Sequence, residues 1–352
     1  MDVRAVIEQF KIEGTISDFF PLGNGHINST VLCVCSNNKK YVLQKINNYV
    51  FKDVEALMNN YYKVTEFLHN KGIETIHLVK TKDNEVYLKN EDGYFRVYEY
   101  IDNAVWYEKI TDLEMINTAA KSFGKFHKDL KEFDAKELKE VIPNFHNTYH
   151  RYENLLDAVK EDKMGRVKDC LSEIEFVKSF EGYYDLINDA IKRGILPLTV
   201  THNDPKINNV LFDKDTGEIR AVIDLDTVMP GSYLYDFGDA LRSLFTGENE
   251  DSEDLSRLYV RYEVFKAYVK GYLSEMGNIL THEEKELLPF SVFLLTIECG
   301  MRFLEDYIRG DVYFKISKPN HNLVRARTQL ALAKIIYRKL DKMKAITNKY
   351  AK

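Results

Sequence analysis

The spacing of apolar residues changes near residue 101, and this change limits what the chain can fold into. Before it, β-rich runs alternate with short Gly and Asn turns, which is the pattern of strands joined by hairpins. After it, apolar residues recur at helical spacing over long segments. The pattern predicts an α+β protein with a β-rich N-terminal lobe, residues 1–101, and a mainly helical C-terminal lobe, residues 102–352. A ligand is then expected in the cleft between the lobes, where pockets commonly occur.

Individual elements follow from the same spacing. In the N-terminal lobe we expect one helix over Asp53–Asn70 and strands over Thr15–Leu22, Ser29–Cys35, Tyr41–Ile46, Ile76–Lys80, Val86–Lys89 and Tyr94–Ile101. In the C-terminal lobe we expect helices over Asp112–Phe133, Tyr149–Val159, Glu173–Arg193, Asp254–Met276, His282–Asp306 and Leu323–Lys344. These helices are interrupted by short strands at Thr199–Val200, Val210–Phe212 and Ala221–Asp224.

The composition argues against several classes of protein. A net charge of -6 argues against binding to a nucleic-acid backbone, because such binding depends on clustered Lys and Arg. The longest apolar run, Leu287–Leu304, contains Glu298 and Arg302, so we interpret it as a buried helix and not as a membrane span. The first residues are charged and lack the apolar core of a signal peptide. Cys33 and Cys35 would share one face of a strand as packing residues, without a second pair for zinc. We therefore expect a soluble, cytoplasmic protein with reduced thiols.

The densest group of polar residues lies in Thr201–Leu211. Asp204 and Asn209 have the spacing of a phosphotransferase catalytic loop, in which the Asp meets an attacking hydroxyl and the Asn supplies a neutral oxygen to a metal ion. Asp224 follows an apolar strand, where its carboxylate can hold Mg²⁺ against the phosphates of ATP. The pattern therefore predicts phosphoryl transfer from ATP, with Asp204 at the hydroxyl and with Asn209 and Asp224 at the metal.

Other interpretations of these residues stay open. Asp-Pro and Asn-Asn pairs also form ordinary turns, and carboxylates in turns often cap backbone groups. We expect His202 to hydrogen-bond the backbone of its loop rather than to transfer a proton. Asp226 is either a second metal contact or an acceptor that fixes its loop.

The N-terminal lobe carries a weaker signal. Gly23 and Gly25 lie in a turn whose backbone can approach phosphates closely, although an ordinary hairpin explains them equally well. Lys45 lies on the next strand, at the place of the lysine that pairs with phosphate oxygens in kinases. Gln44 and Lys45 point to opposite faces by strand alternation, and the sequence does not say which of them faces the nucleotide. Glu55 is either a partner of Lys45 or a solvated helix charge.

Polar residues of the C-terminal lobe suggest a substrate site. Glu298 and Arg302, four residues apart on one helix, form either an internal salt bridge or a site where Arg302 donates hydrogen bonds to a substrate. Tyr313 lies in the following loop, where its hydroxyl can cap a polar ligand. The acidic stretch Glu248–Asp254 is a candidate site for a polycationic substrate, but it is more simply interpreted as a solvated loop.

Several segments carry a resemblance to known families. Thr201–Leu211 and Val222–Asp239 resemble the aminoglycoside phosphotransferase and choline kinase superfamily, whose fold is protein-kinase-like. A narrower resemblance, to the N-acetylhexosamine 1-kinase family, extends from Gly14 to Leu330. It is carried by LGNGHINST, YVLQKIN, THNDPKINNVL, IDLDTVMPGSYLYDFGD, ECGMRFLEDYIRGDVYF and HNLVRARTQ. The resemblance implies a protein-kinase-like two-lobed fold with the active site in the cleft.

The narrower resemblance also implies an activity and roles for single residues. That family transfers the γ-phosphate of ATP to the anomeric hydroxyl of N-acetylglucosamine or N-acetylgalactosamine, which gives the sugar 1-phosphate. By position, it implies that Asp204 is the catalytic base beside the sugar and that Asn209 and Asp224 hold Mg²⁺. It further implies sugar contacts from His26, Arg302 and Tyr313, phosphate contacts from Gly23, Gly25 and Lys45, and adenine contacts from the hinge residues Glu99 and Tyr100.

Two alternatives remain beside this expectation. In the first alternative, the chain is a kinase whose acceptor is another sugar, an amino alcohol or an aminoglycoside. In the second, it is a non-catalytic binding protein that kept the kinase shape. The intact Asp204, Asn209 and Asp224 argue against the non-catalytic protein. The expected partners are ATP and a small-molecule sugar, without nucleic acid or membrane. Oligomeric state and the preference between the two sugars do not follow from the sequence.

Overall fold

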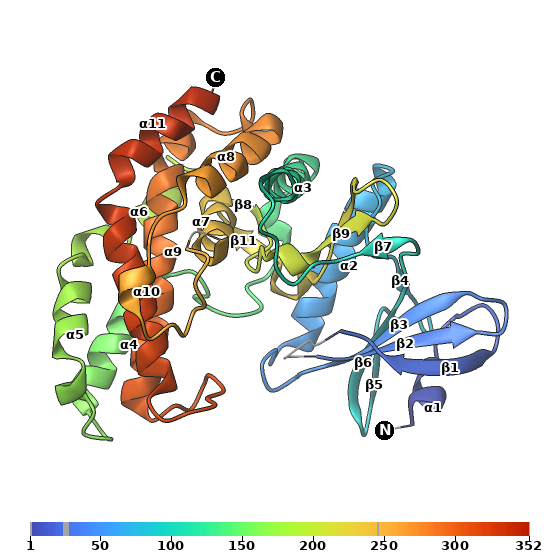
Figure 1. The fold of residues 1–352 in the computed structure, drawn as a ribbon. Helices are drawn as coiled ribbons and strands as arrows, with labels where there is room; N and C mark the ends of the chain where they lie inside the picture. The colour runs from blue at the N-terminus through green and yellow to red at the C-terminus, as the bar shows by residue number, and fades with distance from the viewer. Residues whose placement is uncertain (1, 24–27, 245, 352) are drawn as a thin grey trace. The chain divides into compact units, whose positions relative to one another are not determined.

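The structure is a computed structural model that describes residues 2–23, 28–244 and 246–351. These residues form two compact units (Figure 1). The sheet unit comprises Met1–Tyr107, Asp129–Pro143 and Asn208–Pro230, and the helical unit comprises Glu108–Lys128, Asn144–Ile207 and Gly231–Lys352. The mixture of strands and helices confirms the expected α+β class. Each unit draws on several stretches of the chain, so the division into lobes 1–101 and 102–352 stays a prediction.

The sheet unit is built on an antiparallel sheet with the strand order β1-β2-β3-β6-β4, in which β5 also pairs with β6 (Figure 1). The strands are β1 (Ile16–Pro21), β2 (Ser29–Cys35), β3 (Lys40–Ile46), β4 (Leu78–Val79), β5 (Leu88–Asn90) and β6 (Gly93–Glu99). A smaller sheet has the order β10-β9-β7, with β7 (Ala104–Val105), β9 (Val210–Asp213) and β10 (Ile219–Val222). The helices of this unit include α1 (Val3–Ile7) and α2 (Val54–Asn70). Helix α2 begins after its cap Asp53, as the sequence predicts.

One face of the main sheet forms a hydrophobic core with α1. Tyr41 and Leu43 of β3 belong to this core, and Lys45 shares their face by strand alternation. Cys33 and Cys35 of β2 are buried in the same core, which confirms them as packing residues with free thiols. On β3, Val42 and Gln44 alternate with Tyr41, Leu43 and Lys45, and they therefore point to the other face of the sheet.

The remaining helices lie wholly or mostly in the helical unit. They are α3 (Leu113–Leu130), α4 (Thr148–Glu161), α5 (Leu171–Lys178), α6 (Leu186–Lys192), α7 (Tyr233–Leu244), α8 (Tyr262–Met276), α9 (His282–Arg309), α10 (His321–Tyr337) and α11 (Leu340–Tyr350). The short strand β8 (Thr199–Thr201) also lies in this unit, and it pairs with β11 (Met229–Gly231). Helix α9 packs against α4, α7, α10 and α11 (Figure 1). Gly238 permits close packing of α7 on α9, because a Cβ there would lie 2.5 Å from the carbonyl oxygen of Ser291.

Helix α9 contains the longest apolar run. It has the length and hydropathy of a membrane span, but 83% of its most apolar stretch is buried inside the structure. Burial of this extent, together with Glu298 and Arg302 within the run, is typical of the central helix of a folded domain.

Three expected helices are interrupted in the structure. The segment 173–193 is divided into α5 and α6 by a turn around Gly182, because glycine weakens a helix. Helix α8 begins only at Tyr262, since Asp254 accepts a hydrogen bond from the amide of Ser256 and caps a separate short turn. The segment 323–344 is divided into α10 and α11 at Lys339, whose amide bonds the carbonyl of Ile336. The expected strand at 221–224 also ends early, at Val222.

Candidate active site

Two candidate metal ligands lie at the same end of the β9–β10 hairpin. Asn209 directly precedes β9 and Asp224 follows β10, while Val210 and Val222 pair in register between them. The amide of Ile223 donates a hydrogen bond to the carbonyl oxygen of Asn209 at 2.9 Å, which fixes the two chain segments side by side. Asn209 is buried and Asp224 is exposed. The sheet unit thus brings an amide side chain and a carboxylate side chain to one edge.

The chemistry of these two side chains fits a magnesium ion. Mg²⁺ prefers oxygen ligands and is usually held by one or two carboxylates together with substrate phosphates and water. Asp224 offers a carboxylate and Asn209 an amide oxygen. Within the part of the chain that the structure describes, no three His, Cys, Asp or Glu side chains gather as a metal site of their own. An ion held by Asn209 and Asp224 would therefore take its other ligands from a nucleotide and from water.

The turn after Asp224 is fixed from the main sheet. Asp224 itself has a left-handed backbone, with φ of 62°, and leads into a short turn, η5 (Leu225–Thr227). The carboxylate of Asp226 accepts a hydrogen bond from Nδ2 of Asn28 at 2.5 Å and forms an ion pair with the guanidinium of Arg96. Both charged side chains of this pair are buried. These contacts favour Asp226 as an acceptor that fixes its loop over a second metal contact.

Helix α2 holds the residue that follows this turn. Nδ2 of Asn60 donates hydrogen bonds to the carbonyl oxygens of Val228, at 3.0 Å, and Lys139, at 2.7 Å. Oδ1 of Asn60 accepts a third hydrogen bond from the amide of Lys139 at 3.0 Å. The η5 turn is therefore held by side chains from both the sheet and α2.

Gln44, and not Lys45, lies on the face of the sheet that carries this pair. Arg96 of β6 lies opposite Gln44 of β3, and its Nε and Nη2 donate to Oε1 of Gln44 at 2.9 and 2.6 Å. Lys45 points to the α1 face instead, so its predicted phosphate contact is not favoured by this placement. Glu55 is exposed, and among the ion pairs between described residues none joins it to Lys45.

The loop that carries Asp204 is anchored by a buried carboxylate on α7. Asp236 accepts hydrogen bonds of 2.7 Å from the amides of His202 and Asn203 and from Nε2 of His127. Burial opposes ionisation, but the hydrogen bond from His127 and those from the backbone hold the pKa of Asp236 below its usual value. The amide of Asp204 donates to Nδ1 of His202 at 3.3 Å, which confirms the structural role expected for this histidine.

The carboxylate of Asp204 contacts a cation of its own loop. Nζ of Lys206 lies 2.7 Å from Oδ1 of Asp204. Burial acts to lower the pKa of Lys206, but the charge and hydrogen bond of Asp204 raise it above its usual value, so the ammonium group stays charged. Asp239 of α7 also acts on Lys206, and is itself paired with Arg242 through an Nε–Oδ1 distance of 2.8 Å. Asp204 therefore belongs to a network of paired charges that orients its carboxylate.

Phe314 links Arg302 and Tyr313 near the C-terminal end of α9. The guanidinium carbon of Arg302 lies 5.5 Å from the ring centres of both Phe145 and Phe314. The ring of Phe314 lies 4.7 Å from that of Tyr313, which is exposed. Asp306 fixes this loop, because its carboxylate accepts hydrogen bonds from the amides of Tyr313 at 2.8 Å and Phe314 at 2.9 Å. The helical unit thus presents a guanidinium and a phenol close together.

Glu298 is not the partner of Arg302. Its carboxylate accepts hydrogen bonds from Nδ1 of His146 at 2.9 Å and from the hydroxyl of Thr148 at 2.5 Å. Burial acts to raise the pKa of Glu298, but the positive field and hydrogen bond of His146 hold it below its usual value. The alternative of an internal Glu298–Arg302 salt bridge is therefore replaced by a Glu298–His146 pair, and Arg302 packs on aromatic rings.

The hinge residues are engaged in the main sheet. The amide of Glu99 donates to the carbonyl oxygen of His77, and the amide of Tyr100 donates to that of Lys40, each at 3.0 Å. Both amides are thus used within the sheet unit, so an adenine contact from these residues would use their carbonyl oxygens. The adenine role of Glu99 and Tyr100 stays a prediction.

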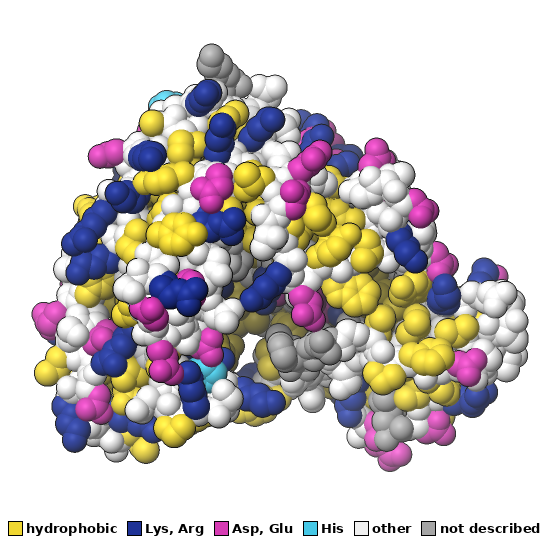
Figure 2. Space-filling view, in the orientation of Figure 1, with side chains coloured by type: hydrophobic (Ala, Val, Ile, Leu, Met, Phe, Trp, Pro, Cys, Tyr) yellow, Lys and Arg dark blue, Asp and Glu magenta, His cyan; other side chains and the backbone are white. Residues whose placement is uncertain are grey.

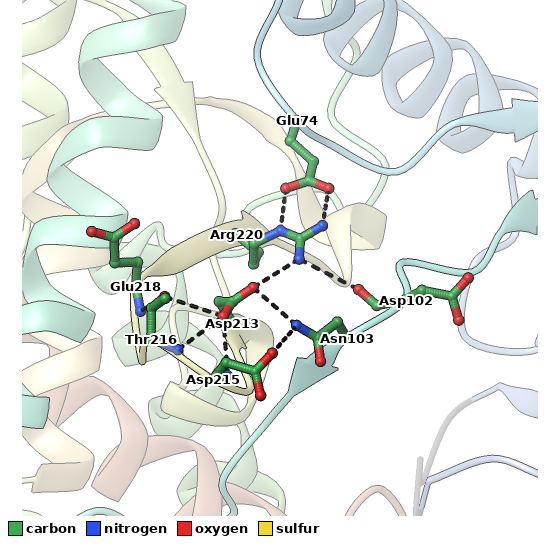
Figure 3. Close-up of polar contacts among 8 residues, drawn as sticks. All are labelled: Glu74, Asp102, Asn103, Asp213, Asp215, Thr216, Glu218 and Arg220. Atoms are coloured by element: carbon green, nitrogen blue, oxygen red, sulfur yellow. Dashed lines mark hydrogen bonds and ion pairs between the residues drawn. The ribbon is translucent and has the colours of Figure 1, made fainter.

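A charge network ties the segment after the hinge to the β9–β10 hairpin (Figure 3). Arg220 of β10 donates two hydrogen bonds of 2.6 Å to the carboxylate of Glu74. Its Nη1 also reaches the carboxylate of Asp213 at 3.2 Å and the carbonyl oxygen of Asp102 at 3.4 Å. Asn103 donates to Asp213 at 3.4 Å. The hinge and the hairpin that carries Asp224 are therefore braced together within the sheet unit.

The acidic stretch 248–254 is largely exposed, as expected of a solvated loop, and several of its carboxylates also form ion pairs. Its carboxylates contact basic side chains of the helical unit, in the pairs Glu248 with Arg257, Glu250 with Arg242, Asp251 with His321, and Glu253 with Lys318. A linear pattern does not reveal the partners of Asp251 and Glu253, because His321 and Lys318 are distant along the chain. On the face drawn in Figure 2, acidic and basic side chains are likewise interspersed.

Two predicted contacts, Gly25 and His26, lie outside the described residues. Gly23 is described and has a left-handed backbone, with φ of 72°, a conformation that favours glycine. The phosphate role of Gly23 and Gly25 and the sugar role of His26 stay predictions.

Comparison with known proteins identifies the family. A family model described as the phosphotransferase enzyme family (APH) matches residues 18–268. The chain belongs to this phosphotransferase family. The matched residues include the Asp204 loop and the β9–β10 hairpin with Asn209 and Asp224. An uncharacterized kinase-like protein of Caenorhabditis elegans is 26% identical over 184 residues, which are 51% of this chain and 46% of that protein. The aligned segment thus spans about half the length of that relative.

Solved structures of phosphotransferases share the fold. An aminoglycoside phosphotransferase from Alicyclobacillus acidocaldarius has a TM-score of 0.61 at 13% identity, with 97% of each chain covered. A microcompartment-associated aminopropanol kinase has a TM-score of 0.61 at 16% identity, with 96% of each chain covered. An amicoumacin kinase in complex with AMP-PNP and Ca²⁺ has a TM-score of 0.56 at 15% identity, covering 90% of this chain and 88% of that one. The expected kinase-like fold is therefore confirmed.

Proposed function

We propose that this phosphotransferase is an ATP- and Mg²⁺-dependent kinase of N-acetylhexosamines that phosphorylates the anomeric hydroxyl and yields the sugar 1-phosphate. The observation that carries the proposal of a kinase is the meeting of Asn209 and Asp224 at one end of the β9–β10 hairpin. A carboxylate and an amide oxygen at this place suit Mg²⁺ with a triphosphate. The amicoumacin kinase, which shares the fold, binds an ATP analogue and a divalent ion, and this supports ATP as the donor.

In this proposal, Asp204 receives the proton of the sugar hydroxyl. Its carboxylate is oriented by the contact with Lys206 and by a loop whose amides are held by Asp236. An anomeric hydroxyl is more acidic than an ordinary alcohol, so the base need only orient it and accept the proton late. When bound, Mg²⁺ neutralises charge on the phosphates. The chain's own task is then positioning.

A neutral acceptor suits the polar residues of the helical unit. Arg302 presents a planar guanidinium near the rings of Phe145 and Phe314, and Tyr313 presents a phenol whose ring packs on Phe314. Both groups can hydrogen-bond sugar oxygens without a strongly charged pocket. The acidic stretch 248–254, by contrast, is already paired with basic side chains. This pairing disfavours it as a site for a polycationic aminoglycoside, which is the alternative acceptor together with amino alcohols.

A substrate panel tests the proposal. ATP consumption is measured with N-acetylglucosamine, N-acetylgalactosamine, choline, ethanolamine and an aminoglycoside. The two sugars should give the strongest response, and the product should lose its reducing end because the anomeric oxygen becomes esterified. The methyl glycoside of N-acetylglucosamine is the matched control, because its anomeric oxygen is blocked, and it should be inert. A response to amines alone, or an active methyl glycoside, would refute phosphorylation of the anomeric hydroxyl.

A further inference from the structure

Arg96 is a buried cation whose partners come from three different elements. Its guanidinium donates to Gln44 on β3, pairs with Asp226 on the η5 turn, and lies 4.3 Å from the ring centre of Tyr61 on α2. The side chain is 1% exposed. Burial opposes the charge of Arg96, but the carboxylate of Asp226 raises its pKa above the ordinary value, so the guanidinium stays charged.

Stability alone gives little reason for such a pair. Removing two charges from water is costly, and well-packed apolar side chains of similar volume often replace a buried ion pair without loss of stability. Gln44 also fixes the orientation of Arg96. Its Oε1 accepts hydrogen bonds from both Nε and Nη2, which holds the plane of the guanidinium. A guanidinium with a fixed plane also fixes the position of the Asp226 carboxylate that pairs with it.

The partner Asp226 lies two residues after Asp224, on the turn that sets the position of the proposed metal ligand. The left-handed backbone of Asp224 is unfavourable for a residue with a side chain, so its surroundings must hold it. Asp226 is tied to Arg96 and Asn28, and the side chain of Asn60 holds the carbonyl of Val228 just beyond the turn. Arg96 therefore acts on the stretch that carries Asp224, although sequence reasoning gave Arg96 itself no role.

We propose that Arg96 is a positioning residue for the divalent ion: through Asp226 it fixes the η5 turn, and thereby holds the carboxylate of Asp224 in place for the metal–nucleotide complex. This inference rests on the proposed function, because it assigns the metal to Asn209 and Asp224. Residues that orient metal ligands commonly change metal affinity by about 10- to 100-fold when they are replaced. The same range is expected for Arg96.

The test compares binding with and without metal in the full-length chain. For wild type and Arg96→Met, Mn²⁺ binding to the enzyme–ADP complex is followed by electron paramagnetic resonance, and ADP binding in EDTA is followed by calorimetry. We expect Arg96→Met to weaken Mn²⁺ binding by about tenfold or more, while metal-free ADP binding stays close to that of wild type. Lys89→Met, which removes an exposed positive charge from the neighbouring strand β5, is the matched control and should leave both quantities unchanged.

Two further variants keep the test decisive if Arg96→Met folds poorly. The double variant Arg96→Met with Asp226→Asn removes both buried charges, so it should regain stability and still bind Mn²⁺ weakly. Arg96→Lys keeps the charge but has no fork to join Gln44 and Asp226, so it should recover Mn²⁺ affinity only in part.

Each outcome bears on the proposal. If Arg96→Met weakens metal-free ADP binding as much as Mn²⁺ binding, Arg96 has a merely structural role and the inference is overturned. An unchanged Mn²⁺ affinity would overturn it as well. A wild-type protein that binds ADP but no Mn²⁺ would instead overturn the proposed function at its metal site. The two failures are distinguished by the wild-type measurement alone.

Discussion

Asn203 and Asp224 adopt left-handed backbone conformations, with φ of 64° and 62°. For residues with a side chain this conformation costs about 1 kcal/mol or more, and it persists only where neighbouring contacts enforce it. The amide of Asn203 is held by Asp236, and the turn after Asp224 is held through Asp226. One of these residues precedes the proposed base Asp204 and the other is a proposed metal ligand. Other Asn and Asp residues of the chain share this conformation, so at Asn203 and Asp224 it is the contacts of the neighbouring residues that distinguish the site.

Asp204→Asn tests the proposed base. The two side chains have nearly the same shape, so the loop held by Asp236 should stay folded, but an amide does not accept the proton of the hydroxyl. We expect kcat to fall by about 100- to 10,000-fold, with little change in melting temperature or in ADP affinity. Steady-state kinetics and thermal unfolding measure these quantities. Asp189→Asn on α6 is the control, and retained turnover in Asp204→Asn would remove Asp204 from this role.

Sequence reasoning found some site residues and missed others for a physical reason. Asp204 and Asn209 share one loop, so their spacing alone indicates a shared task. Arg96 lies 52 positions from Gln44, and Asp236 lies 34 positions from His202. The roles of Arg96 and Asp236 exist only through such distant partners, and a linear pattern does not contain them. An isolated Arg in a strand-like run carries no signal of such a role.

At the scale of elements, α2 contributes to the site through one buried amide. Asn60 satisfies two carbonyl groups and one amide on segments that meet it only in the folded chain. Helical spacing predicted α2 itself, because this spacing depends on neighbours along the chain. The same spacing did not reveal the breaks between α5 and α6 or between α10 and α11, because local turns and tertiary packing decide where a helix ends.

Asn60→Ala should therefore weaken both the fold and the metal site. The loss of three hydrogen bonds leaves buried backbone groups without partners, and we expect the free energy of unfolding to fall by about 2 to 4 kcal/mol. The loosened turn beyond Asp224 should also weaken binding of a metal–nucleotide complex. Urea unfolding and titration with Mg²⁺ and ADP measure the two effects. Asn59→Ala, one residue earlier on α2, is the control and should change stability by about 0.5 kcal/mol or less. Equal effects of the two variants would contradict this role of Asn60.

At the scale of the whole molecule, several ionised carboxylates are held inside the helical unit. The pKa values of Asp236, Asp239 and Glu298 are all lower than usual, because cationic or hydrogen-bonding partners outweigh their burial. A carboxylate with a lowered pKa stabilises the fold fully above its ordinary pKa and loses this contribution as the pH falls through its folded value. The pKa of Glu284 is shifted in the opposite direction, because burial raises it and favours the protonated form. The three ionised groups act in the same direction, so stability should fall in acid.

Asp236→Asn tests this dependence on pH. The ordinary pKa of an aspartate is 3.8, so the stabilisation from Asp236 should be complete at neutral pH and lost as the pH falls below about 4. The variant lacks this ionisable group and places an amide against donors, so at pH 7 it should be less stable by about 3 kcal/mol or more. Its stability should then change less than that of wild type between pH 7 and pH 3, because one of the protonation steps coupled to unfolding is gone. Urea unfolding across this range measures both effects, with the exposed Asp157→Asn on α4 as control. Equal slopes in Asp236→Asn and wild type would show that folding leaves the pKa of Asp236 unchanged, and would contradict the lowered pKa that its partners give it.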